Sequence, residues 1–235
     1  MIEWLKNSPE RLKDSPERLK DSPERLKNGP EQPRARLLLA HGAGAPMDSE
    51  FMQVMAEGLC ALGVDVWRFE FPYMAERRQT GKKRPPSPAP QLLDSFREAI
   101  GEARSELPDR PWFIGGKSMG GRMATMLADE VETEGVVCLG YPFHPPGKPE
   151  KTRIEHLFEL TRPCLIVQGI RDPLGSQSEV EAYALPERFQ WCWLEDGDHD
   201  FRPRVKSGYR QADHWHSAQV AAANFMAATM AGRIE

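Results

Sequence analysis

The chain has 235 residues, of which 40% are hydrophobic, and its formal net charge is −4. This length is enough to bury one sizeable core, so a single globular domain is expected. The slightly acidic balance gives no basis for binding nucleic acid, and no stretch approaches the roughly 18 consecutive apolar residues that a membrane span needs.

Residues 1–33 differ in composition from the rest of the chain. The hexapeptide Ser-Pro-Glu-Arg-Leu-Lys recurs, and leucines fall seven residues apart, as in a coiled coil. However, each proline inside a helix costs about 3 kcal/mol, and only one position of the heptad is apolar. We therefore predict a low-complexity, disordered tail over 1–33 and a folded domain over 34–235, with an arm that binds a protein partner as the alternative. Because the first residues lack the apolar core of a secretory signal, a cytoplasmic location is expected.

From residue 34 onward, apolar runs alternate with helix-like stretches. The predicted strands are Arg36 to Ala40, Val64 to Phe71, Trp112 to Gly115, Gly135 to Gly140, Cys164 to Gly169 and Phe189 to Leu194. The predicted helices are Ser49 to Leu62, Ala89 to Leu107, Met119 to Val131, Lys151 to Leu160, Ser176 to Tyr183 and His214 to Ala231. This alternation predicts an α/β fold, in which right-handed crossovers place helices on both faces of a parallel sheet.

The cysteines are scattered through the apolar stretches of the sequence. None of them forms a CxxC pair, and all of them lie after the tail, at Cys60, Cys138, Cys164 and Cys192. This pattern favours reduced, buried thiols over disulfides or a metal site.

Ser118 lies in a GxSxG sequence directly behind one of these predicted strands. A serine on a sharp strand-to-helix turn needs neighbours without side chains, and Gly116 and Gly120 meet that need. The helix that follows would direct its first backbone N–H groups toward a developing oxyanion, with Met119 N–H as one donor. The sequence therefore predicts a nucleophile elbow at Ser118.

Other polar residues follow the later strands in the order typical of a hydrolase triad. Asp172 comes after the strand that ends at Gly169, and His199 comes after the last strand. A serine hydroxyl becomes a good nucleophile when a neutral imidazole takes its proton, and a buried carboxylate orients and stabilises that imidazole. We assign these roles to Ser118, His199 and Asp172. Asp172 could instead merely begin a turn with Pro173, and His199 could be a surface histidine or a metal ligand.

Two further loops are predicted to border the reaction centre. In the glycine-rich turn after the first core strand, Ala43 N–H is the preferred second oxyanion donor, Gly44 is close behind it, and His41 supports the turn. The predicted substrate-binding residues are Gly42, Gly44, Tyr141, Phe143 and His144. The basic segment from Met74 to Pro88 is read as a solvated loop, with attraction of an anionic substrate as the alternative.

From about Arg34 to the end, the chain resembles the α/β-hydrolase superfamily, specifically its small, lidless, dienelactone-hydrolase-like group. The resemblance is carried by four blocks, which are His41 to Ala45, Gly116 to Arg122, Tyr141 to Lys148 and Asp196 to Phe201. These blocks are similar to predicted bacterial hydrolases related to the eukaryotic testis-expressed and acetyltransferase-complex hydrolase-like proteins. The resemblance implies an α/β-hydrolase fold without a lid domain and a serine-hydrolase triad, but it supplies no substrate.

The sequence departs from that group in two ways. Dienelactone hydrolases use a cysteine nucleophile where this chain has Ser118, which favours small esters or thioesters over lactones. The usual first two strands have no counterpart before Arg36, so a sheet of about six strands is expected. We expect a small-molecule ester substrate and no cofactor. A non-catalytic, hydrolase-like interaction protein and a metal enzyme using Asp198, His199 and Asp200 are the alternatives.

Overall fold

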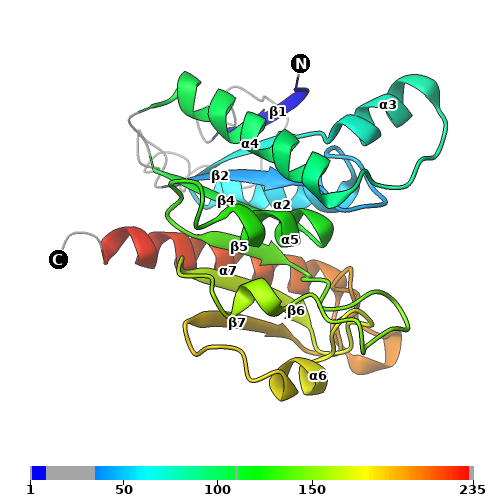
Figure 1. Cartoon of the computed structure of the whole chain (residues 1–235). Coiled ribbons are helices and arrows are strands. Elements are labelled where there is room, and N and C mark those ends of the chain that lie inside the picture. Colours follow the sequence, from blue (N-terminus) through cyan, green and yellow to red (C-terminus); the bar gives the residue numbers. More distant parts are fainter. Residues whose placement is uncertain (1, 9–34, 109–110, 233–235) are drawn as a thin grey trace, which may run out of the picture.

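The computed structural model describes residues 2–8, 35–108 and 111–232, and its described residues form a sheet of seven strands in the order β1-β3-β2-β4-β5-β6-β7 (Figure 1). The strands are β1 (Trp4–Asn7), β2 (Ala35–Ala40), β3 (Val64–Phe69), β4 (Trp112–Lys117), β5 (Val136–Leu139), β6 (Cys164–Gly169) and β7 (Phe189–Leu194). Strands β2 to β7 pair in parallel, while β1 pairs antiparallel with β3. The predicted mostly parallel α/β architecture is confirmed.

Successive residues of each central strand contribute to different apolar layers. In β2, Leu38 and Ala40 pack into the layer under α4 (Ala89–Glu106) and α5 (Met119–Leu127). Leu37 and Leu39 pack into the layer under α2 (Glu50–Ala61) and α7 (Gln211–Ala231). Figure 1 shows α4 and α5 in front of the sheet and α2 and α7 behind it. Coverage of both faces explains why the strands read as continuous apolar runs rather than as alternating ones.

Two segments differ from the predicted helices and loops. The predicted helix from Lys151 to Leu160 is only the single 3-10 turn η2 (Glu155–Leu157), because Arg153 uses its backbone N–H and C=O to bind Phe143 O and the Tyr141 hydroxyl. The basic segment predicted as a loop contains most of helix α3 (Pro72–Thr80), whose first position is a proline. A short helix α6 (Gln177–Ala182) and the 3-10 turn η3 (Val205–Ser207) complete the described elements.

The connection between β5 and β6 carries no separate domain. Residues 140–163 contain only η2 among regular elements, and they lie against the carboxyl end of the sheet. The expected absence of a lid insertion at this point agrees with the structure.

Strand β1 corrects the expectation of about six strands and of a tail without structure. Trp4 packs edge-to-face on Trp67, with ring centroids 5.7 Å apart, and its indole N–H donates to Glu102 at 3.0 Å. The Lys6 ammonium lies 3.7 Å from the centre of the Trp67 ring and 2.5 Å from the Glu106 carboxylate. The four residues of β1 pair with β3 and so cover an edge of the sheet that would otherwise be exposed. The repeat over residues 9–33 lies outside the described residues.

The expectation of reduced cysteines agrees with the structure. All four thiols are free; Cys60, Cys138 and Cys164 are buried, and Cys192 is half-buried. Burial raises the pKa of the Cys60 thiol to about 12, so this thiol stays protonated. Among the described helices, none has the length and apolar character required to cross a membrane.

Replacing Trp4 with alanine tests whether β1 is part of the folded domain. The change removes the indole from its contact with Trp67 and Glu102, and we expect the free energy of unfolding to fall by about 2 kcal/mol. Urea denaturation followed by tryptophan fluorescence and circular dichroism measures the loss. The control is Phe158→Ala, whose ring is 45% exposed and which should change stability by less than about 0.5 kcal/mol. Equal stability of Trp4→Ala and the wild type would show that β1 contributes nothing to the domain.

Candidate active site

Ser118 occupies a strained turn between β4 and α5. Its backbone has φ 51° and ψ −113°, a conformation that residues other than glycine rarely adopt. A Cβ atom on Gly120 would lie 2.5 Å from Ala40 O, and one on Gly116 would lie 2.6 Å from the same oxygen. The two glycines therefore allow α5 to begin directly against the end of β2, which holds Ser118 at the carboxyl edge of the sheet.

Three side chains from three strand ends form a continuous hydrogen-bonded relay. Ser118 Oγ lies 2.9 Å from His199 Nε2, and His199 Nδ1 lies 2.7 Å from Asp172 Oδ2. Asp172 is fully buried, whereas 22% of the His199 side chain is exposed. The structure thus brings together the three residues that the sequence singled out, with the geometry that proton transfer from serine to histidine requires.

Asp172 also begins a turn, which was the alternative interpretation of this residue. Its Oδ1 atom accepts a hydrogen bond of 2.8 Å from Leu174 N–H, and its carbonyl accepts one from Gly175 N–H. One carboxylate oxygen therefore organises the loop after β6 while the other faces His199. The two interpretations are compatible.

Gln168 holds Asp172 from the opposite side, and sequence analysis missed it. Its amide nitrogen lies 2.9 Å from Asp172 Oδ2 and 3.1 Å from both Tyr141 O and Gly175 O. Its amide oxygen accepts a 2.7 Å hydrogen bond from Tyr141 N–H. A fully buried glutamine inside an apolar strand was the available signal, since a buried amide is retained where it is hydrogen-bonded.

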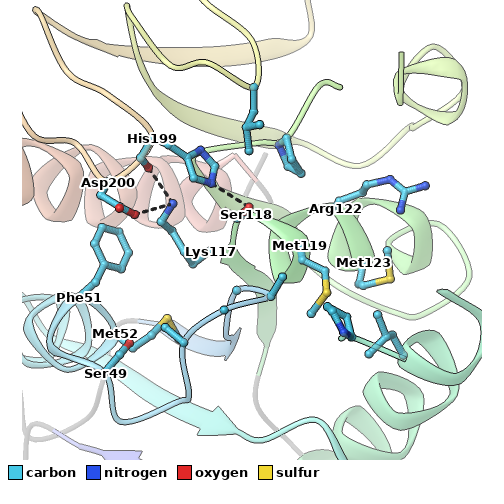
Figure 2. Close-up of a pocket in the computed structure, with 18 of the residues that line it drawn as sticks. Ser49, Phe51, Met52, Lys117, Ser118, Met119, Arg122, Met123, His199 and Asp200 are labelled. Atoms are coloured by element: carbon cyan, nitrogen blue, oxygen red, sulfur yellow. Dashed lines mark hydrogen bonds and ion pairs between the residues drawn. The ribbon is translucent and has the colours of Figure 1, made fainter. Parts of the chain in front are cut away.

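Lys117 is a second residue that the sequence analysis did not single out. Its Nζ atom donates to His199 O at 2.7 Å and lies 3.4 Å from Asp200 Oδ1 (Figure 2). The side chain is buried beside the Phe51 ring, and burial lowers its pKa. A charged residue at the end of an apolar strand, directly before the nucleophile, could have identified it. Lys117 fixes the backbone of His199 relative to β4.

The acidic residues beside His199 have structural partners. Asp198 Oδ1 accepts backbone hydrogen bonds from Asp200 and Arg202, both at 2.9 Å, and Asp200 faces Lys117. Across the described ranges there is no group of three or more histidine, cysteine, aspartate or glutamate residues placed to hold a metal ion. The geometry around His199 therefore supports the relay rather than a metal centre built on Asp198, His199 and Asp200.

The glycine-rich turn after β2 lies beside the nucleophile. A Cβ atom on Gly42 would be 3.8 Å from Ser118 Cβ, and the Tyr73 hydroxyl donates to Ala43 O at 3.0 Å. Buried His41 accepts a 3.0 Å hydrogen bond from Phe71 N–H at Nε2, and burial lowers its pKa, which favours the neutral ring. His41 is thus placed to support the turn. Oxyanion donation by the N–H groups of Ala43 and Met119 stays a prediction.

A cavity of about 670 Å³ opens onto Ser118 and His199. Gly42, Ala43, Gly44 and Met119 line it, as predicted for residues around the reaction centre. The other lining residues are Ala45, Ser49, Phe51, Met52, Pro86, Ser87, Ala89, Leu92, Lys117, Arg122, Met123, Pro142, Pro146, Arg153, Leu174 and Asp200. From the basic segment, the loop residues Pro86 and Ser87 reach the cavity. Figure 2 shows lining residues on both sides of Ser118, with Lys117 and Asp200 on one side and Arg122 and Met123 on the other.

Three predicted substrate-binding residues do not line this cavity. The Tyr141 side chain is buried, with its hydroxyl bound to Arg153 O at 2.8 Å, and the Phe143 ring packs on it with centroids 4.7 Å apart. His144 is also buried, with Nε2 3.6 Å from Glu179 Oε1. These side chains pack behind the loop, while Pro142 and Pro146 face the cavity in their place. The cavity therefore gives no support to their assignment to substrate binding.

Gly120→Ala tests the steric basis of the elbow. The added methyl group would meet the carbonyl oxygens of Ala40 and His41 at 2.5 and 2.7 Å, so we expect a loss of about 3 kcal/mol or more in the free energy of unfolding. Gly101→Ala in α4 is the matched control, because a Cβ there meets no atom within 4 Å and should leave stability unchanged or raise it by up to about 1 kcal/mol. Urea unfolding of both variants checks this, and a Gly120→Ala protein as stable as Gly101→Ala would contradict the close packing.

Comparison with known proteins agrees with this architecture. Residues 33–227 match the family described as alpha/beta hydrolase domain. The fold is similar to that of a lidless serine hydrolase from Xanthomonas campestris, with a TM-score of 0.64, 17% identity and 83% of each chain covered. It is also similar to dienelactone hydrolase from Anabaena variabilis, with a TM-score of 0.63, 19% identity and coverage of 83% of this chain and 87% of that one. The fold is also similar to that of an alpha-beta serine hydrolase homologue from Coxiella burnetii, with a TM-score of 0.59, 15% identity and coverage of 83% of this chain and 85% of that one. The chain belongs to the α/β-hydrolase family.

Proposed function

We propose that this chain is a serine hydrolase that cleaves small esters or thioesters through an acyl-enzyme. The observation that carries the proposal is the relay from Ser118 Oγ through His199 to buried Asp172, which opens into a cavity at the carboxyl edge of the sheet. Membership of the α/β-hydrolase family supports hydrolysis in general. The ester or thioester preference rests on the serine nucleophile and on the absence of a lid insertion between β5 and β6.

Each residue of the relay has one task in the proposed reaction. His199 Nε2 takes the proton of Ser118 as Oγ attacks the substrate carbonyl carbon, and the oxygen that becomes negative is bound by Met119 N–H and Ala43 N–H. Collapse of this intermediate breaks the bond to the alcohol or thiol, which leaves with the proton from His199. Water then attacks the acyl-serine by the same route and releases the acid. The Asp172 carboxylate orients His199 and stabilises the charged imidazole.

The walls of the cavity favour a small acyl group. They include the apolar side chains of Met52, Met119, Met123 and Pro142, of which the three methionines pack on the domain core. A cavity of about 670 Å³ is in the range of small-molecule sites. Short esters are therefore expected to react faster than long-chain lipids.

Ser118→Ala tests the nucleophile. The wild type should be labelled by a fluorophosphonate probe and should hydrolyse p-nitrophenyl acetate and butyrate. The variant should lose the label, and its kcat should fall by roughly 10³-fold or more, because no oxygen remains to form the acyl-enzyme. Circular dichroism verifies that the variant is folded. A folded wild type that shows neither labelling nor turnover would favour the non-catalytic, hydrolase-like interaction protein.

Gln168→Met tests the support of Asp172. The methionine has a similar volume but cannot donate a hydrogen bond to Asp172 Oδ2. The Asp172 carboxylate is then held less firmly, and it orients the His199 ring less precisely. We expect kcat for p-nitrophenyl butyrate to fall about 10- to 100-fold while KM changes little. Gln177→Met, on the surface of α6, is the control and should retain wild-type kcat. If KM rises and kcat is unaffected, Gln168 does not act through the relay.

A further inference from the structure

Two arginines at one end of the cavity are not engaged with acidic groups. Arg122 lies one helical turn beyond Ser118 on α5, and Arg153 lies in the loop between β5 and β6; both line the cavity. The Nε atom of Arg122 is buried without a hydrogen-bond partner. Within residues 2–8, 35–108 and 111–232, neither guanidinium has an ion-pair or side-chain hydrogen-bond partner.

Three titratable side chains that interact electrostatically with Arg122 do not offset its charge. The Tyr141 hydroxyl is buried, which raises its pKa, so it remains neutral. Burial, together with the Arg122 charge, lowers the pKa of His156 to about 4, so this ring is also neutral near pH 7. Burial, and then repulsion by Arg122, lowers the pKa of Arg153. Two like charges in a partly buried site repel each other, and an anion bound between them would offset that repulsion.

The other cationic residue of the cavity already has a partner. Lys117 donates to His199 O and faces Asp200. In Figure 2, Arg122 lies on the opposite side of Ser118 from Lys117 and Asp200. The cavity therefore has one end where charges are paired and one end with unpaired positive charge, and the nucleophile lies between them.

We propose that Arg122 and Arg153 form a carboxylate-binding subsite, so that the substrate cleaved at Ser118 is an ester or thioester carrying a carboxylate a few bonds from the scissile carbonyl. This inference rests on the proposed hydrolase function. A guanidinium presents planar, paired N–H donors that match a carboxylate, and two of them on one anion would orient the substrate as well as bind it. Fixing the far end of the substrate in this way holds the carbonyl near Ser118 Oγ.

Two matched pairs of substrates test the subsite on the full chain. p-Nitrophenyl hydrogen adipate is compared with p-nitrophenyl 6-oxoheptanoate, in which a methyl group replaces one carboxylate oxygen. 4-Acetoxyphenylacetate is compared with 4-acetoxyphenylacetamide, which places the acid on the alcohol side. For at least one pair we expect kcat/KM to be about 10- to 100-fold higher for the acid than for its neutral partner. Equal values in both pairs would overturn the proposal.

Arginine variants identify the residues responsible. In Arg122→Met and Arg153→Met, the acid-to-neutral ratio of kcat/KM should fall about 10-fold or more toward unity. Arg104→Met is the matched control, because Arg104 pairs with exposed Glu132 on the surface and should keep the wild-type ratio. An acid preference that survives in both variants would assign it to other groups and overturn the proposal.

A binding measurement separates failure of the subsite from failure of the proposed hydrolase activity. Monomethyl adipate and 4-acetoxyphenylacetate are titrated separately into the Ser118→Ala protein by calorimetry, which needs no turnover. Binding that is lost on adding Arg122→Met or Arg153→Met supports the subsite even if no ester is hydrolysed. Absence of binding to the folded Ser118→Ala protein contradicts it, even if neutral esters are hydrolysed by the wild type.

Discussion

The candidate site depends on the close approach of α5 to the ends of β2 and β4. Gly116 and Gly120 leave no space for a side chain between these elements, and Ser118 takes a left-handed backbone conformation as a result. This single constraint holds the Ser118 hydroxyl at the carboxyl edge of the sheet, where the first N–H groups of α5 have no partner within the helix. Packing thus fixes the position of Ser118, and the loops that carry His199, Asp172 and the glycine-rich turn are placed around it.

Buried polar side chains join neighbouring loops and thereby hold the relay residues together. Gln168 connects the loop after β5 to Asp172, and Lys117 connects the end of β4 to the backbone of His199. Such groups are costly to bury unless every donor finds an acceptor, and here the packing supplies those acceptors. The core of the domain thus determines the positions of reactive atoms as well as overall stability.

Much of the fold and of the candidate site could be predicted from the pattern of residues in the sequence. The six parallel strands could be predicted because buried strands of a covered sheet are continuous apolar runs. The relay residues could be predicted because the carboxyl ends of parallel strands lie at the same edge of the sheet. Strand β1 could not, because four residues next to a repeat owe their conformation to contacts with Trp67 and Glu102 far along the chain. The burial of Tyr141 and Phe143 could not be predicted, because sequence does not show which side of a loop faces the core. Gln168, Lys117, Arg122 and Arg153 depend on neighbours distant in sequence, so their roles required three-dimensional distances.

The bond from Lys117 to His199 O has a further consequence for motion. The histidine is held at its ring by Asp172 and at its main chain by the residue that precedes the nucleophile. If the loop after β7 swung outward, the Lys117 amine would remain at a buried position without its carbonyl acceptor, which is an unfavourable state. Opening of that loop is thereby penalised, and thermal fluctuation of the distance between base and nucleophile is restrained. Any flexibility that the domain uses to admit a ligand is better sought in the loop that carries Pro86 and Ser87, which lines the same cavity.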